Sequence, residues 1–368
     1  MTGKFVINDR LFFAIVVALS LFGLVMVYSA SSIISFDKYQ DSWFYFRRQL
    51  AFVVAGFFCM GVAVATDYHR WIRSGGYLLG FAILSLVLVQ VPGIGMKVGG
   101  ATRWIGLAGF RFQPAEFAKL ACIIYMAWAL VRKGDNVKSF AYGLLPMGIV
   151  AGVLAGLLMM QPDFGNAVVL VTICGVMIFL AGGRIAYLIG SVLVLAPVAL
   201  SLVMGASYRK RRLLAFLDPW ADPQNTSYQI VQSFTAFFSG GAWGQGLGNG
   251  QEKLHYLPEV HTDFIAAVVG EELGFFAVTL LIGAFFVLTL RGYRVALKAP
   301  DRSGYLLAAG CTTLIGLQAS LNLGVVMGLL PTKGLPLPFI SHGGSSLIMT
   351  FFACGLILAV ARQSKEVS

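Results

Sequence analysis

The chain has few charged residues. Only 12% of its 368 residues are Asp, Glu, Lys or Arg, whereas 58% are hydrophobic and the mean hydropathy is +0.81. A soluble domain carries about 25% charged residues, so this composition excludes an ordinary soluble fold. Long apolar runs recur along the whole sequence. We therefore predict an all-α polytopic membrane protein that forms one integral membrane domain over residues 1–368.

Cysteines at metal-ligand spacing, low-complexity segments and nucleotide-binding loops are also lacking. The five cysteines lie inside apolar runs, so we interpret them as small core residues. The glycine-rich stretch GGAWGQGLGNGQ at 240–251 follows no predicted strand, and we expect a tight loop that covers another part of the chain rather than a phosphate loop. The first apolar run is too long for a signal peptide and is expected to be retained.

About ten transmembrane helices are predicted from the apolar runs. They lie near 11–34, 49–66, 76–92, 115–131, 140–160, 166–182, 186–206, 264–290, 303–329 and 345–361. With both termini inside, the inner segments hold 14 of the 27 Lys and Arg residues and the outer segments hold 13. Without the five in the long outer loop at 207–262, between spans 7 and 8, the ratio is 14 to 8, which favours N-in and C-in.

The outer positive charges form three clusters, at 46–49, 95–120 and 208–213. One interpretation is contact with anionic lipid headgroups. The other is a site for an anionic ligand, such as a pyrophosphate, on the outer face. We favour the site for the second cluster, and both interpretations stay open for the third, which contains Arg211 and Arg212.

Three carboxylates occur in or beside the eighth span. Thr262 is a plausible N-cap, which would place Asp263 in the first turn of the helix at the outer surface. There Asp263 is either a helix cap or a general base. Glu271 and Glu272 lie about 12–13 Å deeper at 1.5 Å per residue. We predict that they are buried structural acids, paired with Arg or Lys of a neighbouring span, rather than catalytic groups.

The segment FQPAEFAKL at 112–120 begins the fourth span. Glu116 and Lys119 are three residues apart on one helical face, so they form either a local ion pair or a site where Lys119 holds a phosphate. Just upstream, Arg103 and Trp104 combine a cation with an aromatic face. That combination suits a sugar or phosphate site, and it also suits an interfacial anchor.

The segment LLPTKGLPLPFISHGGSSL at 329–347 joins the last two spans. Its prolines prevent a helix, yet it is apolar enough to lie at membrane depth, where irregular backbone must be buried or line a cavity. We expect it to line an outer cavity, with Ser341 and His342 as its polar side chains. Asp163, in the turn QPDFGN, is expected to cap the sixth span.

Four of these motifs together resemble the SEDS family (shape, elongation, division and sporulation), and within it the cell-division members more than the elongation members. They are LPEVHTDFIAAVVGEELG, GATRWIGLAGFRFQPAEFAKL, QPDFGNA and LLPTKGLPLPFISHGGSSL. The resemblance implies a peptidoglycan glycosyltransferase that polymerises lipid II on the outer face of the cytoplasmic (inner) membrane. It makes Asp263 the essential carboxylate and adds Trp104, Lys119 and His261 of the HTDF motif to the substrate site.

The resemblance also implies partners: a class B penicillin-binding protein and a divisome activator subcomplex, with no nucleic acid. It leaves a divalent cation, Mg²⁺ or Mn²⁺, open as a cofactor. Two positions depart from the family pattern, because His342 replaces a tyrosine and His255 replaces a glutamate that is linked to activation. Three alternatives remain: a lipid II flippase in which Glu271 and Glu272 relay protons, an elongation-type polymerase, and a divisome scaffold without chemistry.

Overall fold

The computed structural model describes residues 9–98, 100–107, 110–225, 227–251 and 260–364, and His255 lies outside these ranges. The first helices are α1 (Arg10–Tyr39), α2 (Phe44–Ala65), α3 (Tyr68–Arg73), α4 (Gly75–Leu88), α5 (Pro114–Lys133), a 3₁₀ turn (Gly134–Lys138), a π-helical turn (Phe140–Leu144) and α6 (Leu145–Met160). They are followed by α7 (Phe164–Leu180), α8 (Ile185–Met204), α9 (Ser207–Leu217), α10 (Tyr228–Gly240), α11 (Ile265–Leu297), α12 (Arg302–Val326) and α13 (Gly344–Ser364).

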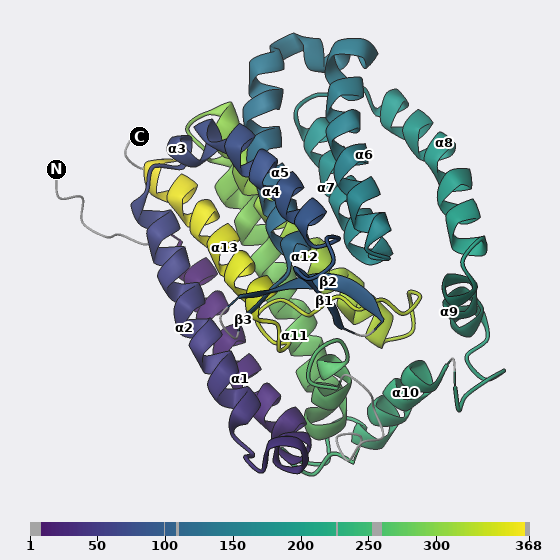
Figure 1. Ribbon diagram of the computed structural model, residues 1–368. Helices are drawn as coiled ribbons and strands as arrows, with labels where there is room; N and C mark the ends of the chain where they lie inside the picture. Colours follow the sequence, from purple (N-terminus) through teal and green to yellow (C-terminus); the bar gives the residue numbers. More distant parts are fainter. Residues whose placement is uncertain (1–8, 99, 108–109, 226, 252–259, 365–368) are drawn as a thin grey trace.

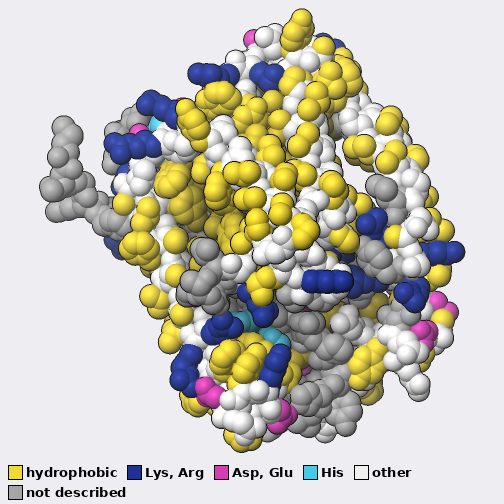
Figure 2. Space-filling view, in the orientation of Figure 1, with side chains coloured by type: hydrophobic (Ala, Val, Ile, Leu, Met, Phe, Trp, Pro, Cys, Tyr) yellow, Lys and Arg dark blue, Asp and Glu magenta, His cyan; other side chains and the backbone are white. Residues whose placement is uncertain are grey.

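Apolar helices dominate the molecule, as predicted. Seven of the described helices are long and apolar enough to cross a membrane, and three shorter apolar helices coincide with the remaining predicted spans at α4, α7 and α8. Figure 2 shows hydrophobic side chains over the broad middle of one face, with Lys and Arg gathered above and below it. This distribution fits a multi-pass membrane protein, while the count of ten spans stays a prediction.

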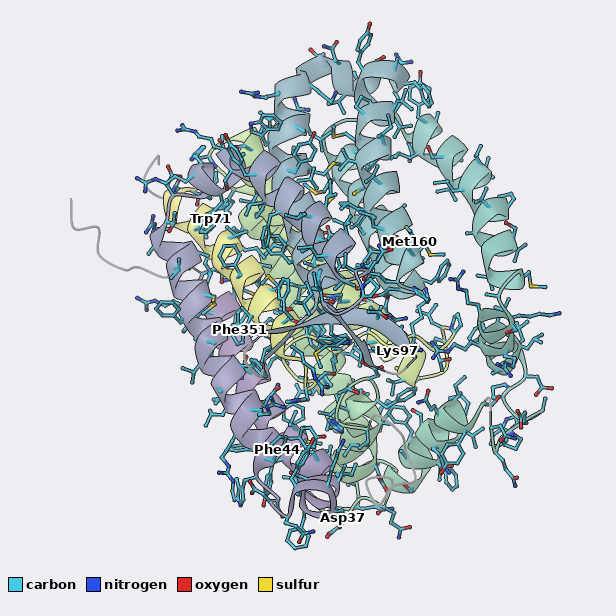
Figure 3. The ribbon with its side chains drawn as sticks, viewed as in Figure 1. Asp37, Phe44, Trp71, Lys97, Met160 and Phe351 are labelled. Atoms are coloured by element: carbon cyan, nitrogen blue, oxygen red, sulfur yellow. The ribbon has the colours of Figure 1, made fainter. Side chains whose placement is uncertain are left out.

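The start of α1 and the end of α13 lie at the same end of the bundle (Figure 1). At that end Arg291 Nη2 donates to Asp9 Oδ1 over 3.1 Å, and Gln363 Nε2 donates to Asp67 Oδ1 over 2.9 Å. Figure 3 shows Trp71 at this end, and Asp37 and Phe44 at the opposite end where α1 passes into α2. An even number of crossings gives this arrangement, with the Asp37 end predicted to be outside.

A small sheet interrupts the helical pattern between α4 and α5. Strands β1 (Gly95–Val98), β2 (Ala101–Leu107) and β3 (Phe110–Phe112) pair antiparallel in the order β1-β2-β3. Gly100 has φ +82° in the turn before β2, a conformation that glycine adopts without strain. The all-α description therefore holds for the bundle but missed this sheet, which carries Arg103 and Trp104.

The centre of the bundle is formed by α5, α12 and α13. In the most apolar stretch of each of these helices, 78% of the residues are buried. In contrast, α8 stands at the edge of the bundle (Figure 1), and none of its described residues is buried. The predicted outer loop at 207–262 is partly helical, because it contains α9 and α10. These two helices lead the chain from α8 to the turn that carries Asp263.

Candidate active site

Asp263 lies in a turn that precedes α11. The helix begins at Ile265 with Phe264 as its N-cap, and no side chain caps it. The predicted cap at Thr262 is therefore wrong, and Asp263 is not in the first helical turn. The Asp263 side chain is half-buried at the entrance to a buried helix. Asp263 thus precedes the N-cap residue of α11, and its role as a general base stays a prediction.

Three backbone carbonyls hold this turn against neighbouring segments. Asn322 Nδ2 of α12 donates to the Asp263 carbonyl over 2.8 Å and also to the Leu335 carbonyl over 2.7 Å. Ser341 Oγ donates to the Thr262 carbonyl over 2.5 Å, and the His342 N–H donates to the His261 carbonyl over 2.9 Å. These hydrogen bonds fix the turn to α12 and to the proline-rich segment at 329–347, which we expected to line an outer cavity.

The same proline-rich segment approaches the carboxylate itself. A Cβ built on Gly334 would stand 2.7 Å from Asp263 Oδ2, which is closer than real Cβ atoms come. Only glycine leaves the carboxylate in its observed position here. Gly334 is exposed, so this contact lies at the surface, where a ligand can reach it.

The two histidines form an aromatic cluster behind the turn. The Tyr45 ring centroid lies 4.6 Å from that of His261 and 5.3 Å from that of His342. His342 Nδ1 is 3.1 Å from Gln49 Oε1. Burial, followed by the charges of His261 and Arg48, lowers the pKa of His342 to about 3. His342 is therefore neutral at growth pH and replaces the family's tyrosine as an uncharged ring.

The helix that follows Asp263 is broken at Gly274. The helix predicted near 264–290 is present as α11. Gly274 has φ +78° and ψ −175°, which divides α11 into a short, largely buried segment from Ile265 to Leu273 and a longer part. The glycine-rich loop fills the break: the N–H groups of Gln245 and Gly246 donate to the Glu271 and Glu272 carbonyls over 3.0 and 2.9 Å. The prediction that this loop covers another part of the chain is confirmed.

Glu271 and Glu272 are both buried at the end of the short segment. Ser29 Oγ of α1 lies 2.8 and 2.6 Å from the two carboxylate oxygens of Glu272, and the Gln251 N–H donates to Glu271 Oε1 over 2.6 Å. These described contacts are polar groups of α1 and the glycine-rich loop, and the pairing with an Arg or Lys of a neighbouring span stays a prediction. These hydrogen bonds attach the segment that follows Asp263 to α1 and to the glycine-rich loop, as expected of buried structural acids.

Lys119 belongs to a buried polar network between α5, α7 and α12. Its Nζ donates to Glu116 Oε1 over 2.7 Å and to Asn166 Oδ1 over 2.8 Å, and its side chain has no exposed surface. Asn166 in turn donates to Asp163 Oδ2 over 2.8 Å, and Gln318 Nε2 lies 3.5 Å from Glu116 Oε2. Asp163 caps α7, as predicted. The ion pair predicted for Glu116 and Lys119 is present, and Lys119 lies beneath the surface.

The other predicted cations lie around this network. Arg103 Nε donates to the Gln161 carbonyl over 3.1 Å, and its Nη2 donates to the Pro162 carbonyl, so it holds the turn before α7. Trp104 is half-buried on β2, opposite Met96 of β1. Arg211 and Arg212 are exposed on α9. Their roles in substrate binding stay predictions.

Lys333 was not among the predicted site residues, and Arg209 was predicted only as a member of the positive cluster at 208–213. The Lys333 ammonium lies 5.0 Å from the centroid of the Phe164 ring, and the Arg209 guanidinium lies 5.9 Å from the same centroid. For Lys333, the signal in the sequence was a lysine inside a proline-rich apolar loop. Within the described parts of the chain, no group of three or more His, Cys, Asp or Glu gathers as metal ligands.

Comparison with known proteins gives a consistent assignment. The model of the FtsW/RodA/SpoVE family, described as "Cell cycle protein", matches residues 9–366. The chain belongs to this family. It is 48% identical over 357 residues to the probable peptidoglycan glycosyltransferase FtsW of Geobacter metallireducens, covering 97% of this chain and 95% of that protein. It is 43% identical over 366 residues to stage V sporulation protein E of Bacillus subtilis, covering 99% and 100%.

Solved structures agree with the family. One chain of a peptidoglycan synthase complex, solved to explain how polymerization and crosslinking are coordinated, superposes with a TM-score of 0.81 at 29% identity and covers 96% of this chain and 97% of that one. The rod shape determining protein RodA of Thermus thermophilus gives a TM-score of 0.71 at 28% identity, with 96% of each chain covered. The arrangement of helices described above is thus the fold of this family.

Proposed function

We propose that this chain is a peptidoglycan glycosyltransferase that polymerises lipid II into glycan strands for septal wall synthesis. The observation that carries the proposal is the Asp263 carboxylate, which lies half-buried at the surface on a turn that α12 and the proline-rich segment hold through the Asp263, Thr262 and His261 carbonyls. A general base needs such a fixed position within reach of its substrate. The relatives named FtsW support this reaction and the division type, and the shared fold with a chain of a peptidoglycan synthase complex supports the reaction.

The chemical step uses one base. Asp263 accepts the proton of the 4-hydroxyl of the acceptor sugar, and the oxygen attacks the anomeric carbon of the donor. The new C–O bond forms as the bond from the anomeric carbon to the lipid pyrophosphate breaks, and the pyrophosphate leaves with the bonding electrons. A single displacement inverts the anomeric centre, so a carboxylate nucleophile is not required. A positioned base supplies about 10²–10⁴-fold in rate.

Stabilising the leaving pyrophosphate is the larger expected contribution. In the proposal, Arg103 and Trp104 border the donor site, and Arg211 and Arg212 on α9 add positive charge. Lys119 and Glu116 act from below, because their buried pair fixes Asn166 and the start of α7. Ser341, His342 and His261 hold the Asp263 turn and its aromatic cluster, which orients the base.

A divalent cation, Mg²⁺ or Mn²⁺, would add to the charge stabilisation of the leaving pyrophosphate. Each catalytic role above is given to the chain's own side chains. We further propose that the protein lies in the cytoplasmic membrane with Asp263 facing outward. A class B penicillin-binding protein would cross-link the strands there, and a divisome subcomplex would activate synthesis.

The proposal is tested by reconstituting the purified chain with its cognate transpeptidase in liposomes. Two readouts are taken from the same vesicles: glycan strands from lipid II on gels, and transbilayer movement of fluorescent lipid II. A polymerase makes strands when lipid II is supplied on the Asp263 side alone. Transbilayer movement without strands would replace the proposal by the flippase alternative.

A further inference from the structure

Two cations from distant parts of the sequence converge on one aromatic ring. Phe164 is the first residue of α7, Arg209 belongs to α9, and Lys333 belongs to the proline-rich segment. The Lys333 ammonium is 5.0 Å and the Arg209 guanidinium 5.9 Å from the centroid of the Phe164 ring. Two like charges on one ring repel each other, so an anion between or beside them would stabilise the arrangement.

Lys333 is a partly buried cation whose charge is not neutralised. Among the residues that the structure describes, no carboxylate lies within 4 Å of its ammonium and no acceptor forms a hydrogen bond with it. Lys119 differs from Lys333, because its ammonium donates hydrogen bonds to Glu116 and Asn166. Burial lowers the pKa of Lys333. A partly desolvated ammonium over a ring face is under-compensated, and it is the kind of group that gains most from an anionic ligand.

The position of Lys333 relates it to the reacting groups. Its sequence neighbour Gly334 lies against Asp263 Oδ2. Consecutive Cα atoms are 3.8 Å apart, so the Lys333 backbone adjoins the residue that contacts the carboxylate. On the other side, the Lys333 stem lies 3.7 Å from a Cβ built on Gly165, which places the lysine beside the start of α7.

We propose that Lys333 and Arg209, together with Phe164, form the binding site for the pyrophosphate of the lipid-linked donor. This assignment rests on the proposed function, adds Lys333 to the site, and chooses the anion site over the lipid contact for Arg209 of the cluster at 208–213. The pyrophosphate oxyanions accept charge-assisted hydrogen bonds from Lys333 and Arg209, and the donor's anomeric carbon then lies on the Asp263 side. As the bond to the leaving oxygen breaks, its added negative charge develops next to both cations.

Lys119 and Lys333 have different roles. Lys119 is inaccessible and positions α7, whereas Lys333 contacts the ligand. Anionic phospholipids present similar phosphate oxyanions at the membrane surface. The proximity to Asp263 favours the donor pyrophosphate over a phospholipid headgroup, and the experiment compares both.

The test uses the full-length protein in nanodiscs of phosphatidylcholine alone. Binding of undecaprenyl pyrophosphate and of phosphatidylglycerol is measured for wild type, Lys333→Gln, Lys333→Arg, Arg209→Gln and Phe164→Leu. Lys210→Gln is the matched control, because it removes the same charge from the adjacent exposed residue of α9. Lipid II polymerisation of each variant gives KM and kcat separately, and thermal melting checks folding.

We expect Lys333→Gln and Arg209→Gln each to weaken undecaprenyl pyrophosphate binding by roughly tenfold or more, as the loss of a charge-assisted hydrogen bond does. Lys333→Arg should restore most of the affinity, and Lys210→Gln should bind as wild type does. If Lys333→Gln does not fold, Arg209→Gln and Lys333→Arg carry the comparison. A change in melting temperature with unchanged affinity would mean a structural role and would overturn the assignment.

The outcomes separate this inference from the function on which it rests. A wild-type protein that makes glycan while Lys333→Gln and Arg209→Gln bind undecaprenyl pyrophosphate normally overturns the inference alone. A wild-type protein that binds undecaprenyl pyrophosphate through these residues but makes no glycan supports the site and contradicts the polymerase. Lys333-dependent binding of phosphatidylglycerol without binding of undecaprenyl pyrophosphate would identify a headgroup site and overturn the assignment.

Discussion

Gly334 lies so close to Asp263 that a Cβ built on it would stand 2.7 Å from Oδ2 of the carboxylate. The two residues come from segments 71 positions apart in the sequence, and the missing side chain of one sets the position of the other. Gly334→Ala should therefore displace the carboxylate while leaving the bundle folded. Because misplacing a reacting group by about 1 Å can cost 100-fold, we expect polymerisation to fall by roughly 10–100-fold.

The measurement is the rate of glycan synthesis from lipid II, with the melting temperature as the check on folding. Gly343→Ala is a suitable control in the same segment, since its built Cβ would make only ordinary contacts at 3.7 Å or beyond. Equal rates for Gly334→Ala and Gly343→Ala would show that the contact with Asp263 does not matter.

The break in α11 provides a prediction about stability. Gly274 has φ +78° and ψ −175°, and a Cβ there would stand 2.4 Å from the Gly244 nitrogen, which is backbone and cannot move aside cheaply. Gly274→Ala should lower the melting temperature, because this region of backbone space costs other residues about 1–3 kcal/mol before any clash.

Gly283, nine residues further along α11, is the matched control because a Cβ there meets nothing within 4 Å. Gly283→Ala should melt at or slightly above the wild-type temperature, since alanine is favoured over glycine inside a helix by about 1 kcal/mol. Both variants replace one glycine of α11 by alanine, so a difference between their melting temperatures measures the effect of the break at Gly274. A Gly274→Ala protein that is as stable as Gly283→Ala would contradict the backbone geometry described here.

The buried pair of Glu116 and Lys119 gives a third prediction. Lys119→Met leaves Glu116 as a buried charge without its ammonium, and breaking such a pair costs about 3–5 kcal/mol. The double variant Glu116→Gln with Lys119→Met should recover part of that loss. Melting curves of the three proteins give the comparison, and Lys138→Met, which breaks an exposed i,i+3 pair with Asp135, should melt as wild type does. An unaffected Lys119→Met protein would show that the pair is not structural.

The end of the bundle where α1 begins and α13 ends is expected to be sensitive to pH through His69. Its Nδ1 lies 2.8 Å from Asp67 Oδ1 and its Nε2 lies 2.9 Å from Asp301 Oδ2. Burial alone would lower the pKa of His69, but the hydrogen bonds to both carboxylates outweigh it and raise the pKa. Protonated His69 therefore stabilises the folded state at pH below its ordinary pKa, and this contribution is lost as pH rises through the raised value.

Melting temperatures between pH 6 and pH 9 test this expectation. The wild type should lose stability as pH rises, and His69→Gln should show a weaker dependence because glutamine does not titrate. Hydrogen bonds from Gln363 and His69 outweigh burial and lower the pKa of Asp67 to about 2, so that carboxylate stays ionised over the whole range and does not contribute to the slope. A slope unchanged in His69→Gln would assign the pH dependence to other groups.

The sequence predicted the positions of the helices well, because each apolar run has the length and hydropathy of a membrane helix. It could not predict the break in α11, since the residues on both sides of Gly274 are apolar and glycine is common in membrane helices. The small sheet was missed because its strands are short and one of them, at 101–107, contains a cation and a tryptophan that suggested a loop at the membrane surface.

The candidate site was predicted in part. Asp263, Ser341 and His342 were expected near one another, and the contacts of the Thr262 and His261 carbonyls bring them together. The burial of Lys119 could not be foreseen, because its partner Asn166 lies 47 residues away on α7. Lys333 was overlooked for the same reason, since its relation to Phe164 exists only after α7 and the last loop have packed together.

The central claim is that Asp263 acts as a base at the outer surface. The most direct measurement is lipid II polymerisation by Asp263→Asn in complex with the cognate transpeptidase, beside Glu271→Gln and wild type. Asparagine keeps the size of the side chain and one acceptor oxygen but cannot take the proton. The account predicts a folded Asp263→Asn protein whose rate falls by at least about 100-fold, while Glu271→Gln still makes glycan. A folded Asp263→Asn protein that polymerises at the wild-type rate would contradict it.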